Sequence, residues 1–289
     1  MMKEGLVQLN RVAEDGMRVR ASAGAGSFHR GETLERHLAE AREQVKRLEQ
    51  EAKEPAGQRQ IRQEAAKRQA AEDRQRRIEE ALRQLPEVAE AKRKQAEAGR
   101  KVTPPRVSST DPDARVMKMG DGGWRPAYNV QFATDTASQV IVGVAVTNQG
   151  TDHGAVTPML EQIERRTGRL PQEVLVDGGF SVKESVQEAD QRDVTVYAPV
   201  PAPKKEGVDP HAPKPRDPPA VAEWRQRMAT PEAKEIYKER AATAECVNAA
   251  SREHRGLRAF RVRGLDKAWG VSLLVAITHD ILRYLSLTM

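Results

Sequence analysis

Alternating apolar and polar residues predict β-strands at the start of the chain and again in its middle. Between residues 5 and 21, apolar positions lie on both sides of the pair Asp15-Gly16, so we expect a strand or a hairpin that turns at this pair. Residues 128–134 and 140–146 are rich in β-branched residues around a short turn and predict a second hairpin. Two shorter apolar runs predict further strands at 173–176 and 194–198.

A long charged segment predicts helices. From residue 33 to about residue 99 the chain is rich in Glu, Arg, Lys, Gln and Ala and almost lacks β-branched residues, a composition that favours helix. Its first part shows the heptad spacing of a coiled coil at Leu34, Leu38, Ala41, Val45, Leu48 and Ala52. Pro55-Ala56-Gly57 breaks the pattern, and a second helix is expected from about Gln58 with a kink at Pro86. We predict an antiparallel helical hairpin, either a solvated coiled coil or an arm that contacts DNA or a second copy.

The remaining segments predict linkers and shorter helices. Residues 102–113 form a Pro/Ser/Thr-rich linker, and the proline-rich stretch 200–220 favours a solvated loop. The apolar stretch 269–287 is interrupted by His279, Asp280 and Arg283, so it is too short for a membrane span and predicts a buried helix. Other helices are expected from Thr151-Asp152 to before Gly168, from about Val182 to Gln191, and over 220–253.

The order of these elements suggests a fold class. Without the charged segment, three strands are followed by a helix, a strand, a helix, a fifth strand and closing helices. This is the order of an α/β, ribonuclease-H-like fold, with a mixed sheet, flanking helices and a long charged helical-hairpin insertion after the first strand. We therefore expect residues 1–30 to form the first strand region, 31–100 the coiled-coil-like insertion, and 101–289 the rest of the catalytic domain.

Composition narrows the partner and the compartment. The formal net charge is +6 and the isoelectric point is about 9.4, which favours a polyanionic partner such as nucleic acid. The single cysteine, Cys246, excludes a disulfide framework and a multi-cysteine zinc site, and this suits a reducing cytosol. Because the N-terminus lacks an apolar signal region, export is not expected.

Three distant carboxylates are candidates for a metal site. Asp177 follows a short apolar strand and precedes Gly178-Gly179, while Asp15 lies in the first strand region and Glu245 in a late helix. In the proposed fold these three positions converge on one edge. Hard carboxylate oxygens are the ligands that Mg²⁺ prefers, and phosphodiester chemistry with two Mg²⁺ ions about 4 Å apart needs such a cluster. Asp135, which also lies beside a strand, is a rival for the first position.

Several motifs together resemble a bacterial insertion-sequence transposase of the DDE type. The resemblance covers nearly the whole chain and implies a Mg²⁺-dependent enzyme that nicks transposon ends and joins the freed 3′-hydroxyls to target DNA. The motifs that carry it are Val12 to Gly24, Asp111-Pro112-Asp113-Ala114-Arg115, Tyr128-Asn129-Val130-Gln131, Val176-Asp177-Gly178-Gly179-Phe180, and Tyr237-Lys238-Glu239-Arg240 with Glu245.

The resemblance assigns roles to individual residues. The catalytic, metal-holding carboxylates of the family fall on Asp15, Asp177 and Glu245. Its Tyr-x-x-Arg signature falls on Tyr237 and Arg240, which are expected to contact DNA together with a basic residue at Arg252. The resemblance further implies two Mg²⁺ ions with Mn²⁺ as a substitute, and double-stranded DNA as partner at both transposon ends and target. It also implies a homodimer or larger active complex, no membrane, and a cytoplasmic, nucleoid-associated protein.

Two alternatives stay open at this stage. Only fourteen residues precede Asp15, whereas such transposases usually carry an N-terminal region that recognises transposon ends, so we expect the catalytic C-terminal part of a longer protein. Cys246 and Asn248 stand where the family usually has larger, basic or aromatic residues. An inactive remnant that only binds DNA is therefore one alternative, and a metal-dependent nuclease of the same fold without a joining step is the other.

Overall fold

The computed structural model describes residues 1–52, 58–180, 183–203 and 207–289, and the chain forms two compact units. Unit 1 consists of Met1–Val19, Asn129–Ala259 and Ala268–Met289. Unit 2 consists of Arg20–Tyr128 and Phe260–Lys267. Two strands, β1 (Arg11–Arg20) and β5 (Trp124–Asp135), pass from one unit into the other.

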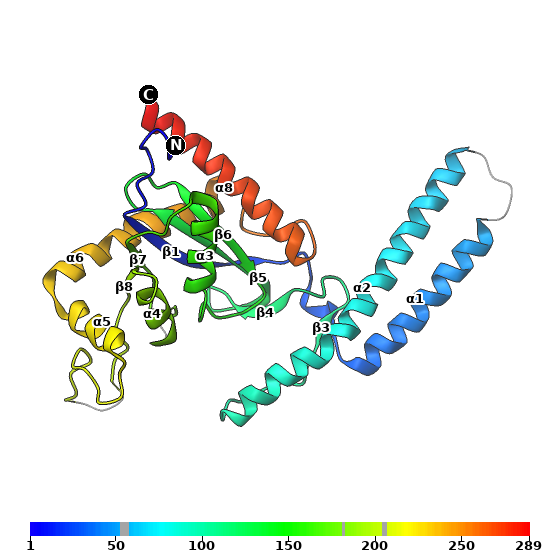
Figure 1. Ribbon diagram of the computed structural model, residues 1–289. Helices are drawn as coiled ribbons and strands as arrows, with labels where there is room; N and C mark the ends of the chain where they lie inside the picture. Colours follow the sequence, from blue (N-terminus) through cyan, green and yellow to red (C-terminus); the bar gives the residue numbers. More distant parts are fainter. Residues whose placement is uncertain (53–57, 181–182, 204–206) are drawn as a thin grey trace. The chain divides into compact units, whose positions relative to one another are not determined.

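A mixed sheet forms the centre of unit 1 (Figure 1). Its strands are adjacent in the order β6-β5-β1-β7-β8. The β1–β7 and β7–β8 pairs are parallel, and the β5–β6 pair is antiparallel. The predicted α/β class with a mixed sheet and flanking helices is confirmed. Beyond β1 and β5, the strands are β6 (Ile141–Thr147), β7 (Glu173–Leu175) and β8 (Thr195–Tyr197).

Strand β1 continues without a turn through Asp15-Gly16, so of the two predicted alternatives the strand is confirmed and the turn at this pair is wrong. Gly16 meets a different requirement, because the carboxylate of Asp152 packs against it. A Cβ at this position would overlap with Asp152 Oδ1 and lie 3.0 Å from Asn129 Oδ1. The glycine thus permits a close side-chain approach in the middle of a strand.

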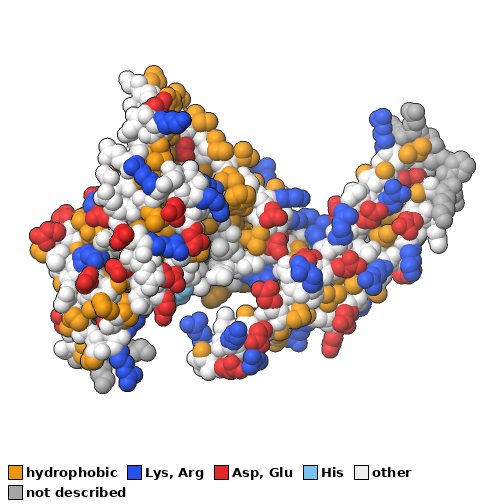
Figure 2. Space-filling view, viewed as in Figure 1, with side chains coloured by type: hydrophobic (Ala, Val, Ile, Leu, Met, Phe, Trp, Pro, Cys, Tyr) orange, Lys and Arg blue, Asp and Glu red, His pale blue; other side chains and the backbone are white. Residues whose placement is uncertain are grey.

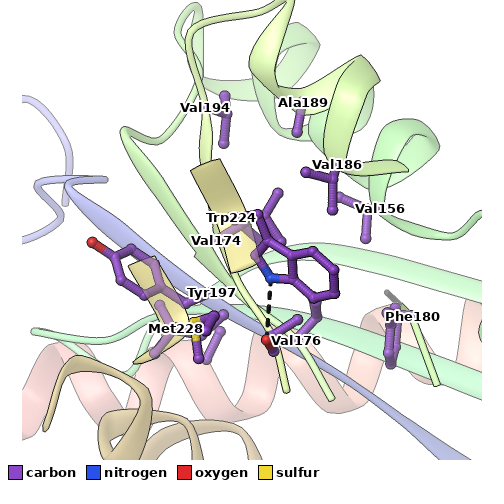
Figure 3. Close-up of a cluster of buried hydrophobic side chains, with 14 of the residues drawn as sticks. Val156, Val174, Val176, Phe180, Val186, Ala189, Val194, Tyr197, Trp224 and Met228 are labelled. Carbon is purple, nitrogen blue, oxygen red and sulfur yellow. Dashed lines mark hydrogen bonds between the residues drawn. The ribbon is translucent and has the colours of Figure 1, made fainter. Parts of the chain in front are cut away.

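Helices cover the β7–β8 side of the sheet and enclose a large apolar cluster (Figure 3). Trp224 lies inside this cluster, and its indole Nε1 donates a hydrogen bond to the carbonyl oxygen of Ala198 (3.1 Å). The predicted start of one helix, Val182, lies outside the described residues, and another helix begins at Val156 rather than at Thr151. The helices are α3 (Val156–Thr167), α4 (Lys183–Asp190), α5 (Pro219–Ala229) and α6 (Pro231–Arg240).

One continuous helical segment runs from α6 into α7 (Cys246–His254) and contains a wider turn between them. This turn, η2 (Ala241–Glu245), is π-helical. A π turn closes its hydrogen bonds over five residues instead of four, and such turns are frequent at functional sites. The segment places Arg240 and Glu245 at the two ends of η2.

Helix α8 (Leu265–Thr288) is not the buried helix that the sequence predicted. One side of it packs in unit 1, where Trp269 Nε1 donates to the carbonyl oxygen of Val144 (3.2 Å). The other side exposes apolar residues, visible along α8 in Figure 2, which include Leu274, Ile277, Ile281 and Leu285. Among the helices in the described part of the chain, α8 alone has the length and apolar composition of a membrane span.

Unit 2 contains the two long charged helices, α1 (Gly31–Glu51) and α2 (Gln58–Glu97), which pack against each other (Figure 1). Their contact buries Leu34 and Ala41 of α1 with Ile78 and Ala81 of α2. Pro86 lies inside α2, while the predicted break at 55–57 lies outside the described residues. The unit also contains η1 (Ala25–Ser27), β2 (Phe28–His29), β3 (Val107–Ser108) and β4 (Arg115–Lys118).

The segment predicted as the linker 102–113 includes one of these strands, because β3 pairs antiparallel with β2. Strand β4 pairs with the unit 2 part of β5, from Trp124 to Ala127. The Asp-Pro-Asp motif is structural here. The carboxylate of Asp111 accepts hydrogen bonds from the Tyr128 hydroxyl (2.7 Å) and the Gly264 backbone N–H (3.0 Å), and thereby joins three segments of unit 2.

Candidate active site

Asp15 projects from the middle of β1 towards the α6–α7 segment. Arg240 Nη2 donates to Asp15 Oδ1 (2.9 Å), and Asn248 Nδ2 donates to Asp15 Oδ2 (2.9 Å). Only 15% of the Asp15 side chain and 11% of the Arg240 side chain are exposed. Both oxygens of this carboxylate are therefore held by side chains from the same helical segment.

The π turn brings Glu245 to the same guanidinium. Arg240 Nη1 donates to Glu245 Oε1 (3.0 Å), so one arginine bridges Asp15 and Glu245. In a regular α-helix, residues five apart point about 140° away from each other. The five-residue turn η2 stacks them instead, because its hydrogen bonds close one residue later.

Asp177 follows β7, next to β1 in the sheet. The backbone N–H of Gly179 donates to Asp177 Oδ1 (2.7 Å) and fixes the carboxylate at the strand end. The negative charge of Asp177 acts on Asp15, Arg240 and Tyr237. The three carboxylates named from the sequence thus lie around one arginine, within unit 1.

A second arginine fixes the position of helix α6 against the sheet. Arg11 of β1 donates from Nε to Glu173 of β7 (2.6 Å) and from Nη1 to Glu239 of α6 (2.5 Å). The Tyr197 hydroxyl donates to the same Glu173 carboxylate (3.2 Å). Because Glu239 directly precedes Arg240, this network sets where the bridging guanidinium lies.

Burial and charge shift the pKa values of the site in distinct ways. Burial raises the pKa of Asp15, and Asp177 adds to this, although Arg240 and the Asn248 hydrogen bond oppose it. Burial tends to lower the pKa of Arg240, but Asp15, Tyr237, Asp177 and Glu245 outweigh it and raise that pKa. Burial also raises the pKa of half-buried Tyr237. The site therefore keeps a firmly protonated arginine among its carboxylates.

A second acidic group lies on the other face of β1 and was not predicted from the sequence. Asp152 is buried and accepts hydrogen bonds from Arg18 (3.0 Å), Asn129 (2.6 Å) and Gln131 (3.2 Å). Asn129 and Gln131 belong to one of the motifs that carry the resemblance. They are two residues apart, so both lie on one face of a strand. This spacing was the only sequence signal for a shared partner such as Asp152. Thr151-Asp152 was interpreted only as a helix start.

Glu14 lies on the same face of β1, and its side chain has no hydrogen-bond partner within the described part of the chain. Its side chain is fully buried, and neither carboxylate oxygen accepts a hydrogen bond. Burial, together with the charges of Asp152 and Asp15, raises the pKa of Glu14 to about 8. Glu14 is therefore largely neutral at pH 7, directly beside the ionisable Asp15.

The other candidates from the sequence occupy different positions. Asp135, the rival for the first carboxylate, accepts hydrogen bonds from Leu9 N–H (3.0 Å) and from Ser138 N–H (2.9 Å) and hydroxyl (2.6 Å). These donors give it a structural role at the β5–β6 turn. Arg252 lies half-buried on α7, two turns beyond Glu245, and its DNA contact stays a prediction.

The donor set suits a divalent cation, although the side chains are not arranged around one. Among the residues that the structure describes, no three His, Cys, Asp or Glu side chains converge closely enough to hold a metal ion as they stand. Arg240 occupies the space between Asp15 and Glu245. The ligand types fit Mg²⁺ or Mn²⁺, which prefer carboxylate oxygens, and Glu245 is 56% exposed and has room to turn.

Comparison with protein families decides the identity. The family described as the transposase DDE domain matches residues 91–281, more than half of the chain. The chain belongs to the DDE transposase family. The resemblance predicted from the motifs is thereby confirmed, and a search of curated proteins finds no match.

Family membership identifies the kind of chemistry. DDE transposases are polynucleotidyl transferases with a transposition-related nuclease or transferase function on DNA, and they generally use divalent metal ions. The matched region contains Asp177 and Glu245, whereas Asp15 precedes it and is separated from it by all of α1 and most of α2.

Proposed function

We propose that unit 1 is a ribonuclease-H-like catalytic domain that cleaves DNA at transposon ends and joins the new 3′-ends to target DNA. The strand order β6-β5-β1-β7-β8, with β1, β7 and β8 parallel, supports this fold. The observation that carries the proposal is the grouping of Asp15, Asp177 and Glu245 around Arg240.

The three carboxylates are the proposed metal ligands. Two bound Mg²⁺ ions would activate the attacking oxygen and stabilise the leaving one during in-line displacement at phosphorus. Asn248 and the Gly179 N–H orient Asp15 and Asp177 for this role. Asn248, which differs from the usual family residue, therefore supports the site rather than indicating decay.

Arg240 is the proposed phosphate-binding residue. A guanidinium donates two parallel hydrogen bonds to a carboxylate or a phosphate equally well. Without substrate, Arg240 neutralises Asp15 and Glu245. When DNA binds, we propose that it transfers these donors to the scissile phosphate, stabilises the charge that develops there, and leaves both carboxylates free for the metal ions.

The test compares Asp177→Asn with the control Asp190→Asn. Asp190 is an exposed residue of α4, and its substitution makes the same change in charge. The probes are labelled duplexes taken from the DNA that flanks the coding sequence, with Mg²⁺ or Mn²⁺. We expect Asp177→Asn to reduce strand nicking by about a thousandfold, equivalent to about 4 kcal/mol, and Asp190→Asn to leave it unchanged. Nicking by Asp177→Asn at the wild-type rate would refute the assignment.

The same assay separates strand transfer from simple hydrolysis. A transposase links the labelled 3′-end covalently to a second duplex, whereas a nuclease of the same fold releases it. Metal binding is followed independently by the rise in melting temperature on adding Mg²⁺, because a ligand that binds only the folded state stabilises it. This rise should be lost in Asp177→Asn and kept in Asp190→Asn.

A further inference from the structure

Unit 2 carries a group of basic residues at one end of its helical pair, which we call the basic cluster: His29, Arg36, His37, Lys92 and Arg106. The imidazole rings of His29 and His37 meet edge to face, with centroids 4.8 Å apart. Strand pairing places His29 opposite Val107, next to Arg106. Lys92 Nζ donates to the carbonyl oxygens of Thr103 (2.8 Å) and Pro104 (3.1 Å) on the same segment.

The basic cluster contains basic side chains without acidic partners. Most arginines elsewhere on α1 and α2 do form ion pairs, as Arg42 does with Glu79 and Arg93 with Glu90 and Glu97. Within the described residues, Arg36, His37 and Arg106 form no ion pair. Burial and the positive charges of His37, Arg106 and Arg36 lower the pKa of His29, and burial and Arg106 lower that of Lys92.

Unit 2 contains a second pair of basic residues, Arg77 and Arg263, that form no ion pair within the described residues. Burial and the nearby charge of Arg263 lower the pKa of Arg77 on α2, and the buried Nε of Arg77 has no hydrogen-bond partner in the described chain. Arg77 and Lys92 are about 22 Å apart along α2 at 1.5 Å per residue. Positive charges therefore gather at two positions along α2, near Arg77 and near Lys92. This arrangement suits a ligand with repeating negative charges.

We propose that the basic cluster binds the phosphate backbone of duplex DNA and that the Arg77–Arg263 pair contacts the same backbone further along. The identification of DNA as the polyanion rests on the proposed function of unit 1. Contacts from arginine, lysine and histidine to phosphates set affinity and position without reading sequence. The charged helical pair therefore acts as a DNA-contacting arm rather than as a solvated coiled coil alone.

The experiment measures binding of the full chain to a random-sequence duplex by fluorescence anisotropy over a range of salt concentrations. The double variant Arg36→Gln/Arg106→Gln removes two exposed, unpaired charges. The matched control, Arg83→Gln/Arg93→Gln, removes two charges from α2 that are paired with glutamates. Thermal melts establish that both variants fold as the wild type does, and Arg36→Lys/Arg106→Lys keeps the charge.

We expect the first variant to lose about tenfold in affinity at about 100 mM salt, and its slope of log affinity against log salt to fall by about 2. The control should change less than twofold, and the lysine variant should retain most of the affinity. Equal losses in both glutamine variants would show that net charge alone matters and would overturn the proposal. Unchanged affinity in the first variant would overturn it too.

Two further measurements are needed. One distinguishes DNA binding by unit 2 from cleavage by unit 1, and the other distinguishes DNA from other polyanions. Asp177→Asn should bind the duplex as the wild type does while failing to cut it, so a failed cleavage assignment leaves the binding result interpretable. Polyglutamate serves as a competitor that is a polyanion without phosphate groups. If it displaced the duplex from the wild type as effectively as unlabelled duplex does, the assignment to a phosphate backbone would be wrong.

Discussion

Charged side chains are mostly exposed on the helical pair of unit 2, but they are buried around Asp15 on β1 of unit 1. On α1 and α2 most ion pairs join exposed residues one helical turn apart, and blue and red side chains alternate along both helices in Figure 2. Around β1, Asp15, Glu14 and Arg240 are covered by protein and have shifted pKa values. Charge density alone therefore does not locate chemistry.

The largest effect should come from breaking the bridge that Arg240 forms between Asp15 and Glu245. Arg240→Gln leaves Asp15 beside Asp177 and Glu245 without its cation, and removal of one partner of a buried ion pair costs about 3 kcal/mol. Urea unfolding should show this loss, and Arg240→Lys should recover part of it. Millimolar Mg²⁺ should stabilise Arg240→Gln more than the wild type, because the ion replaces the missing charge. Equal stabilisation of both would contradict the competition between Arg240 and metal.

Glu14→Gln should reveal a buried acid through its pH dependence. The pKa of Glu14 in the folded chain, about 8, lies above its ordinary value, so its contribution to stability is complete below about pH 4.5 and is lost as pH rises through about 8. The variant should match the wild type at pH 5 and exceed it at pH 8.5 by on the order of 2 kcal/mol. Thermal melts at both pH values test this. Identical pH profiles would mean that Glu14 is solvated.

Asp217 provides a buried charge outside the site, with the opposite sign of pH dependence. Burial opposes its charge, but hydrogen bonds from Lys183 (2.5 Å) and Arg225 (2.7 Å) outweigh this and lower its pKa to about 2. The stabilisation is complete above about pH 4 and is lost as pH falls through about 2. Asp217→Asn should cost about 1 kcal/mol at pH 7, reduced by screening near the surface, and less at pH 3, as measured by urea unfolding.

The smallest effect is expected on the helical pair. Arg42 and Glu79 connect α1 to α2 across 3.0 Å, but 55% and 38% of their side chains are exposed. Arg42→Gln should change the unfolding free energy by about 0.3 kcal/mol, because water and salt screen an exposed pair. A loss as large as that of Arg240→Gln, measured in the same urea series, would remove the distinction between the two regions.

The sequence predicted most of the sheet because each strand has its own local pattern. Residues 140–146 and 194–198 became β6 and β8 within one or two positions. The strand around Gly16 was predicted, but the turn at Asp15-Gly16 was wrong, because a glycine allows either a turn or a close contact and only the folded chain reveals Asp152 beside it. The prediction that α8 is buried was wrong for a similar reason, because apolar composition does not specify how many faces of a helix other elements will cover.

The candidate site was predictable in its residue types but not in its connections. The resemblance identified Asp15, Asp177, Glu245 and Arg240, and the structure groups them. That Arg240 bridges two of the carboxylates depends on the π turn, for which the sequence gives no pattern. Asn248 stood out only as an unusual residue, and its hydrogen bond to Asp15 becomes evident once α7 is in place.

The π turn also affects how related sequences should be aligned. In a regular α-helix a glutamate four positions after the arginine would face the same way, and here the extra residue between Ala241 and Glu245 is absorbed by the wider turn. A single-residue insertion or deletion at this point can therefore leave the pairing of arginine and glutamate intact in space. Motif searches that require a fixed interval between these two residues would discard sequences whose sites are spatially equivalent.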